Sequence, residues 1–243
     1  MDNEKLLSYA LYYGGDYKRI YRAIKINETI KTIAYHGKYL TINDPLYPDE
    51  FNMLRFPPLV LFYKGNINLL AKEKIAVVGS RDHSDYGRSI TCDIVEHLAK
   101  RYVIVSGMAK GIDRIAHLSA IKIGHTIGVL GCGIDHIYPQ ENYDLYELMG
   151  KRDLLLSEYP YNVKPMRHHF PFRNRMIAAL GKNLIVTQAN SRSGTMLTVN
   201  EALELNKDVY VVPYPLTQVE SGCNQLIKQG ANIITCMEDI ENI

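Results

Sequence analysis

The chain has 243 residues, of which 47% are apolar and 22% charged, and its formal net charge is +2. This composition is typical of a folded globular protein and excludes low-complexity, collagen-like and wholly basic chains. The sequence has no apolar run of the ~18 residues that a membrane helix needs, and its acidic start does not resemble a signal peptide. The four cysteines form no C-x-x-C pair, so we expect free thiols in a cytoplasmic protein without a metal site or membrane insertion.

The first ~45 residues are predicted to form a small helical domain. Apolar residues recur with helical spacing from Leu6 to Leu11, and Gly14-Gly15 ends that helix. Similar spacing predicts two more short helices, over residues 20–24 and 30–34, ending near Gly37. A turn-rich connection and a strand at residues 59–63 follow, and we place the main domain at residues 46–243.

From residue 74 onward, short apolar runs alternate with helical segments. The runs predict strands at residues 75–78, 102–105, 126–130, 154–158, 184–187, 209–213 and 233–235. The segments between them predict helices at residues 89–100, 112–123, 196–206 and 223–229. Continuous apolar strands alternating with helices indicate an α/β fold, an extended parallel sheet with helices on both faces. Ligands of such sheets bind beyond the carboxyl ends of the strands.

Glycines beside small polar or basic residues follow four of the predicted strands. Glycine allows close backbone approach, and the free N–H groups at a helix start attract phosphate. The sequence lacks the G-x-x-x-x-G-K-[ST] pattern of an ATPase loop and a G-x-G-x-x-G that opens the first helix. Three of these turns supply the residues that we expect to contact phosphate: Gly79, Ser80, Arg81, Ser106, Gly107, Lys110, Gly111, Ser193, Gly194 and Thr195. The fourth is the Gly131-Cys132-Gly133 turn.

Positive charge is concentrated in residues 151–183, which contain seven Lys/Arg and only two Asp/Glu, whereas residues 207–243 are acidic. Within this basic region, cations alternate with aromatic residues, a pattern suited to a ligand with alternating phosphates and bases. Phe170 is expected to contact a base, and Phe172 to lie in the core. The expected groove residues are Lys164, Arg167, Phe170, Arg173, Asn174 and Arg175.

Several motifs, in order, resemble the DprA/Smf family over residues 47–239. They are Val78–Arg81 with Tyr86-Gly87, Ser106–Asp113 with Ala116-His117, Tyr138-Pro139, Ser157-Glu158, Phe170–Arg175, Ser193–Thr195 with Thr198, Ser221-Gly222, and Leu226-Ile227 with Gly230-Ala231. The resemblance implies an extended Rossmann-like domain that binds single-stranded DNA, forms a homodimer and loads the RecA recombinase in natural transformation. It also implies that residues 1–45 are of the sterile-alpha-motif type. Many family members end in a winged-helix domain, and because this sequence stops at Ile243, just after the last predicted strand, we expect no such domain here.

An enzyme remains the main alternative to a binding protein. Ser193–Thr195 resembles the phosphate loop of the nucleoside-monophosphate phosphoribohydrolases, but Thr198 stands where their motif has glutamate. Asp113 and His117 share a helix face, where such a pair more often fixes a loop, and Glu158 is expected to pair with an arginine. We therefore expect no catalytic residue, no enzyme activity and no cofactor. A nucleotide-sensing regulatory module is a third hypothesis.

Overall fold

A computed structural model describes residues 2–217, 221–241 and 243, and its centre is one nine-stranded sheet. Two antiparallel strands form one edge of this sheet, β1 (Lys38–Thr41) and β2 (Val60–Gly65). The other seven strands are parallel and follow β2 in the order β6 (Leu154–Ser157), β5 (Thr126–Val129), β4 (Val103–Gly107), β3 (Lys74–Gly79), β7 (Leu184–Gln188), β8 (Val209–Val211) and β9 (Asn232–Ile233). The predicted sheet is therefore confirmed, with an antiparallel edge added to it.

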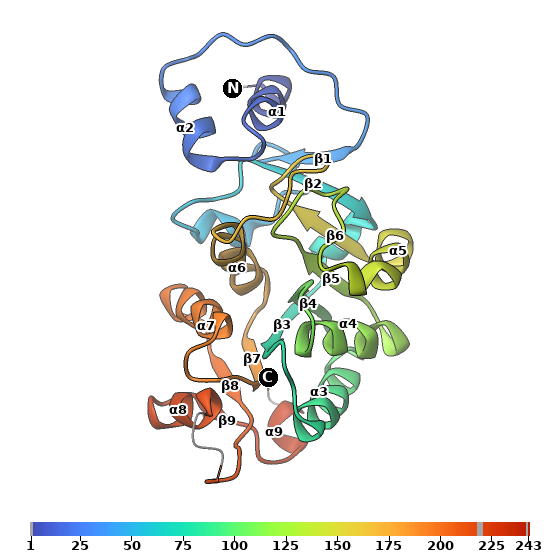
Figure 1. Ribbon diagram of the computed structural model, residues 1–243, viewed down its shortest axis with the longest axis vertical. Coiled ribbons are helices and arrows are strands. Elements are labelled where there is room, and N and C mark those ends of the chain that lie inside the picture. The colour runs from blue at the N-terminus through green and yellow to red at the C-terminus, as the bar shows by residue number, and fades with distance from the viewer. Residues whose placement is uncertain (1, 218–220, 242) are drawn as a thin grey trace.

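Helices cover both faces of the sheet (Figure 1). Along one side lie α3 (Asp85–Leu98), α4 (Ile112–Ile123) and α5 (Tyr143–Arg152). Along the other side lie α6 (His169–Leu180), α7 (Gly194–Glu204) and α8 (Gly222–Lys228). Short helical turns complete the main body at Asp49–Met53, Ile67–Ala71, Gln140–Asn142 and α9 (Glu238–Glu241). None of the helices in the described ranges is long and apolar enough to cross a membrane.

The strand order reverses at the contact between β3 and β7. The chain builds β3, β4, β5 and β6 outward in one direction, and β7 then returns to the free side of β3. The loops after β3 and β7 therefore diverge onto opposite faces of the sheet. This divergence opens a crevice at the carboxyl ends of the two strands, where open α/β sheets bind their ligands.

The N-terminal residues form two helices that pack onto the edge of the sheet. Asp2 and Asp16 cap α1 (Asn3–Tyr12) and α2 (Tyr17–Lys25) by accepting hydrogen bonds from backbone N–H groups. Buried residues of both helices share one apolar cluster with β2 and α5. β1 lies before the predicted boundary at residue 45, yet it pairs with β2 along its whole length.

The predicted third helix, over residues 30–34, is wrong. Residues 28–37 have no regular secondary structure, and Ile33 donates its backbone N–H to the Ser8 hydroxyl at 3.2 Å. Three of the five residues in that stretch are β-branched, which lowers helix propensity, and packing on α1 fixes the segment in an extended form.

Candidate nucleic-acid interface

A groove runs across the carboxyl ends of β3 and β7, between the first turns of α6 and α7. A narrower pocket adjoins it at the turn after β4. The predicted site residues that line the groove are Gly79, Ser80, Arg81, Arg167, Phe170, Arg173, Asn174, Ser193, Gly194 and Thr195, and Lys110 lines the narrower pocket. The structure therefore brings together residues from three separate turns, as the sequence analysis expected for a parallel sheet.

Two glycines let the turns after β3 and β4 pack closely. Gly79 lies against α4, where an added Cβ would be 2.7 Å from the Ile112 side chain. Gly111 has φ +74°, and an added Cβ would be 2.3 Å from the carbonyl oxygen of Ser80. The Ser80 N–H donates to the Gln188 carbonyl at 2.8 Å, so this amide stabilises the turn. These residues shape the groove and leave Arg81 projecting from it.

Arg81 and Phe170 lie together at one end of the groove, where it meets the narrower pocket. The Arg81 guanidinium carbon lies 5.9 Å from the centroid of the half-buried Phe170 ring. The Tyr138 ring lies 5.6 Å from Phe170 and is tilted by 39°. An added Cβ at Gly131 would be 2.8 Å from the Phe170 ring, so this glycine makes room for it. A cation and two aromatic rings thus line one opening.

Lys110 lies on the surface beside this opening and is paired with Glu141. Both side chains are exposed, so water screens the pair and it contributes little to the stability of the fold. The hydrogen bond that Lys110 donates to Glu141 raises the pKa of the lysine amine, so this amine stays charged. An incoming phosphate can therefore replace Glu141 as its partner at low cost.

Arg173 and Asn174 form the floor of the groove and are largely buried. Arg173 donates to the backbone carbonyl of Val129, and its Nε donates to Asn174 Oδ1 at 3.2 Å. Burial raises the pKa of the neighbouring Asp113, and the Arg173 guanidinium opposes that rise. The floor is a connected polar network that fixes the first turns of α6.

Arg175 does not line the groove, and that expectation is wrong. Its side chain is 3% exposed and makes two hydrogen bonds to Glu158, at 2.7 and 2.6 Å. It also donates to the carbonyls of Phe56 and Phe172, and it lies over the Phe172 ring. The predicted pairing of Glu158 with an arginine is confirmed. Phe172, which was expected to lie in the core, is only half-buried, as Phe170 is. The reason is helical geometry: Phe170 and Arg175 project from different faces of α6.

Four other predicted residues also lie away from the lining. Ser106 is fully buried and donates its hydroxyl to the Val77 carbonyl at 2.6 Å. Gly107 is buried against the Asp113 and Arg173 side chains. Gly111 allows the close packing of its turn against Ser80 and does not line the groove. Lys164 is exposed on the loop that leads to α6. Ser106, Gly107 and Gly111 thus support the site without contacting a ligand.

The first turn of α7 presents hydrogen-bonding groups to the groove. The Ser193 hydroxyl oxygen is buried and has no hydrogen-bond partner among the described residues. The neighbouring Gly194 is exposed, and nothing lies within 4 Å of the place where a Cβ would be. Free N–H groups at a helix start favour an anion. An oxygen of a phosphate fits the unused Ser193 hydroxyl.

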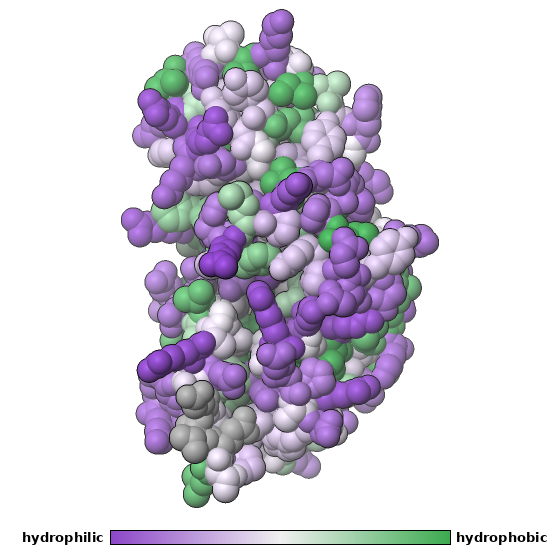
Figure 2. All heavy atoms as spheres, in the orientation of Figure 1, coloured by the Kyte–Doolittle hydropathy of each residue, from purple (hydrophilic) through white to green (hydrophobic). Residues whose placement is uncertain are grey.

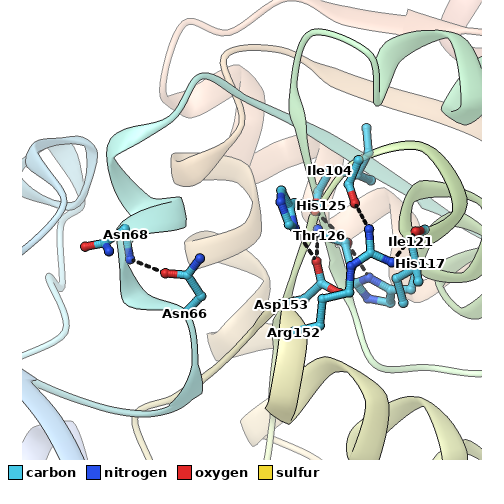
Figure 3. Close-up of polar contacts among 10 residues, drawn as sticks. Asn66, Asn68, Ile104, His117, Ile121, His125, Thr126, Arg152 and Asp153 are labelled. Carbon is cyan, nitrogen blue, oxygen red and sulfur yellow. Dashed lines mark hydrogen bonds and ion pairs between the residues drawn. The ribbon is translucent and has the colours of Figure 1, made fainter.

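Asp113 and His117 do not bond to each other. His117 is fully buried, with Nδ1 2.7 Å from the Thr126 hydroxyl (Figure 3). Its Nε2 lies 2.7 Å from the Gly107 carbonyl. Asp113 accepts a hydrogen bond from the Ala109 N–H at 3.4 Å. The two side chains therefore fix the turn after β4 through separate partners, so their structural role agrees with the expectation while the expected hydrogen bond within the pair is not formed.

Tyr138 and Asn190 are among the lining residues that the sequence did not indicate as ligand contacts. Tyr138 comes from the loop after β5, and Asn190 from the loop after β7. In the sequence Tyr138-Pro139 stands out only as a motif, because Tyr138 is far from Phe170 along the chain and nothing in the sequence indicates that the two rings are in contact. Within the described part of the chain, no three His, Cys, Asp or Glu side chains form a group that could hold a metal ion.

Comparison with known sequences agrees with this geometry. The chain is 41% identical over 202 residues to DNA processing protein DprA of Streptococcus pneumoniae, covering 82% of this chain and 72% of that protein. It is 42% identical over 205 residues to DprA of Bacillus subtilis, covering 83% of this chain and 69% of that protein.

Two solved structures are also similar to this one. The S. pneumoniae DprA crystal structure is 34% identical with a TM-score of 0.82, covering 99% of this chain and 93% of that one. DprA of Helicobacter pylori, solved to study its single-stranded DNA binding mode, is 34% identical with a TM-score of 0.78, covering 85% and 95%. The family model for DNA recombination-mediator protein A matches residues 38–243. The chain therefore belongs to the DNA recombination-mediator protein A family, also named DprA/Smf.

Proposed function

We propose that this protein binds single-stranded DNA in the groove at the β3/β7 crevice. The observation that carries the proposal is the Arg81–Phe170–Tyr138 arrangement beside the unused hydrogen-bonding groups of α7. An aromatic ring can stack on a base only when that base is free of its own duplex stack, so rings in a groove favour a single strand. The single-stranded DNA binding mode described for H. pylori DprA supports the same ligand.

The bound strand is then passed to the RecA recombinase during natural transformation, in the cytoplasm. The family description, a recombination mediator, supports this step. A homodimer suits it, because two linked grooves hold a longer strand more tightly than one without any new type of contact.

A phosphoribohydrolase is the less favoured alternative. Thr198 is 3% exposed in the second turn of α7, at the position where the hydrolase motif has its glutamate. Without that carboxylate the site lacks the group that would act on the sugar. Incubation with AMP is expected to release no free base, and release that is lost with an Asp113→Asn variant, at a carboxylate that lines the groove, would favour the enzyme instead.

Removing one groove cation should weaken the dependence of DNA binding on salt. Arg81→Ala is expected to lower the magnitude of the salt slope by ~0.7 on single-stranded DNA, the value for one lost phosphate contact. Lys110→Ala should have the same or a smaller effect, because Glu141 already neutralises part of its charge. Anisotropy titrations at several salt concentrations measure these slopes, with duplex DNA and RNA of equal length as comparisons. Unchanged slopes in both variants would place the phosphate site elsewhere.

Removing the Phe170 ring should weaken binding without unfolding the protein. Phe170→Ala is expected to cost ~1–3 kcal/mol of binding free energy, the range for one base–aromatic stack. Phe170→Tyr, which keeps the ring, is the matched control and should bind nearly as well as the wild type. Thermal unfolding of each variant separates the two roles of the ring. A large fall in melting temperature with normal affinity per folded molecule would show that Phe170 is a core residue.

A further inference from the structure

Helix α2 presents a basic surface outside the groove. Its nine residues include four cations and no acid: Lys18, Arg19, Arg22 and Lys25. Ile20 and Ala23 are buried and anchor the helix to the apolar cluster that it shares with β2. The opposite face is exposed, and its residues are Lys18, Tyr21, Arg22 and Lys25. We call these four residues the α2 face.

The cations of the α2 face are available for a ligand. No ion pair or hydrogen bond involves the side chains of Lys18, Arg22 or Lys25 within the described ranges. The two acids nearest in sequence already have partners: Asp16 caps the helix at Arg19, and Glu28 accepts a hydrogen bond from the Tyr13 hydroxyl. The charge of this face is therefore not neutralised by the protein itself.

A row of aromatic rings accompanies this charge. Tyr17 and Tyr21 are stacked, with ring centroids 6.0 Å apart and planes 12° apart. The Lys25 amine lies 5.3 Å from the centroid of the Tyr21 ring. Phe56 lies 5.5 Å and Phe172 6.0 Å from Tyr17. Tyr21 is 45% and Phe56 36% exposed, so both rings are accessible to a ligand.

Helix α2 lies on the same side of the molecule as α6 and α7, whose first turns flank the groove (Figure 1). Phe172 contacts Tyr17 and follows Phe170 of the groove by two residues. The turn before α2 also packs on the loop that leads to α6: an added Cβ at Gly14 would meet Val163 at 3.8 Å. Hydrophilic side chains cover the upper left of the molecule, over α2, in Figure 2. A strand that leaves the groove at α6 therefore meets α2 next.

We propose that the α2 face is a second contact for the same single strand, engaged by the part of the DNA that extends beyond the groove. This inference rests on the proposed binding of single-stranded DNA in the groove. The cations neutralise the phosphates of the strand, and an unpaired base stacks on the exposed ring of Tyr21. The parallel rings favour a nucleic-acid strand over an acidic protein or an anionic membrane, for which charge alone would suffice.

The test compares a short oligothymidylate of about 5 nucleotides, which fills the groove only, with a long one of about 20 nucleotides. In the full chain, the triple variant Lys18→Gln/Arg22→Gln/Lys25→Gln removes the cations and leaves the buried anchors intact. The matched control, Lys100→Gln/Lys122→Gln/Lys151→Gln, removes three exposed cations, from the turn after α3, from α4 and from α5. Salt slopes and unfolding curves are measured for each variant.

We expect the α2 triple variant to lower the slope magnitude by about 2 on the long oligomer and to leave the short oligomer unaffected. Tyr21→Ala should lower affinity for the long oligomer about 5-fold or more. An unchanged slope on the long oligomer, or an equal change in the control, would overturn the inference. A loss confined to duplex DNA or to phosphatidylserine vesicles would overturn it too. Failure of the proposed groove is distinguishable, because Arg81→Ala would then leave binding of the short oligomer unchanged.

Discussion

Replacing Arg175 with leucine is expected to lower the free energy of unfolding by about 3–5 kcal/mol. The substitution leaves the Glu158 carboxylate, which is 5% exposed, without its bidentate partner, and a lone buried charge is costly. It also removes the hydrogen bonds to the carbonyls of Phe56 and Phe172. Urea unfolding at neutral pH measures the change.

The double variant Glu158→Leu/Arg175→Leu is the matched control. It removes both charges, so we expect it to be more stable than Arg175→Leu and less stable than the wild type, because the two carbonyl bonds remain lost. DNA binding per folded molecule should change little in both variants, since Arg175 lies outside the groove lining. A single variant as stable as the wild type would show that the pair contributes nothing to folding.

Acid should destabilise the protein through His117. Burial lowers the pKa of this imidazole from 6.5 to about 4, so the folded protein holds it neutral where the unfolded chain takes up a proton. Its contribution to stability is fully present above pH 6.5 and is lost as the pH falls from 6.5 to 4. With 1.36 kcal/mol per unit, the loss is roughly 3 kcal/mol over that window.

His117→Gln isolates this contribution. The glutamine variant will be less stable at neutral pH, because bonds to Thr126 and Gly107 are disturbed, so the informative quantity is the dependence of unfolding on pH. We expect a shallower loss of stability between pH 6.5 and 4 than in the wild type. His36→Gln, at an exposed position, controls for removal of one histidine. If His117→Gln keeps the wild-type pH dependence, His117 is not the group responsible.

The sheet could be predicted from sequence because its strands are buried on both faces. A fully buried strand such as Leu154–Ser157 reads as a continuous apolar run, and the helices between strands show their own period. α6 was missed for the opposite reason. Its residues include Arg173, Asn174 and Arg175, which sequence reasoning places on a surface, yet all three are buried and paired. Local composition cannot reveal partners such as Glu158 that come from another strand end.

The sequence by itself determined the α/β architecture, the strand ends that carry glycine and basic residues, and the cation–aromatic composition of the region near Phe170. Only the tertiary structure decided which of these residues share a groove. The return of β7 to the side of β3 brings the Ser193 turn to the Arg81 turn, and the rotation of α6 turns Phe170 toward the groove and Arg175 toward Glu158. Such choices depend on contacts between residues far apart in the chain, which periodicity and charge counting do not record.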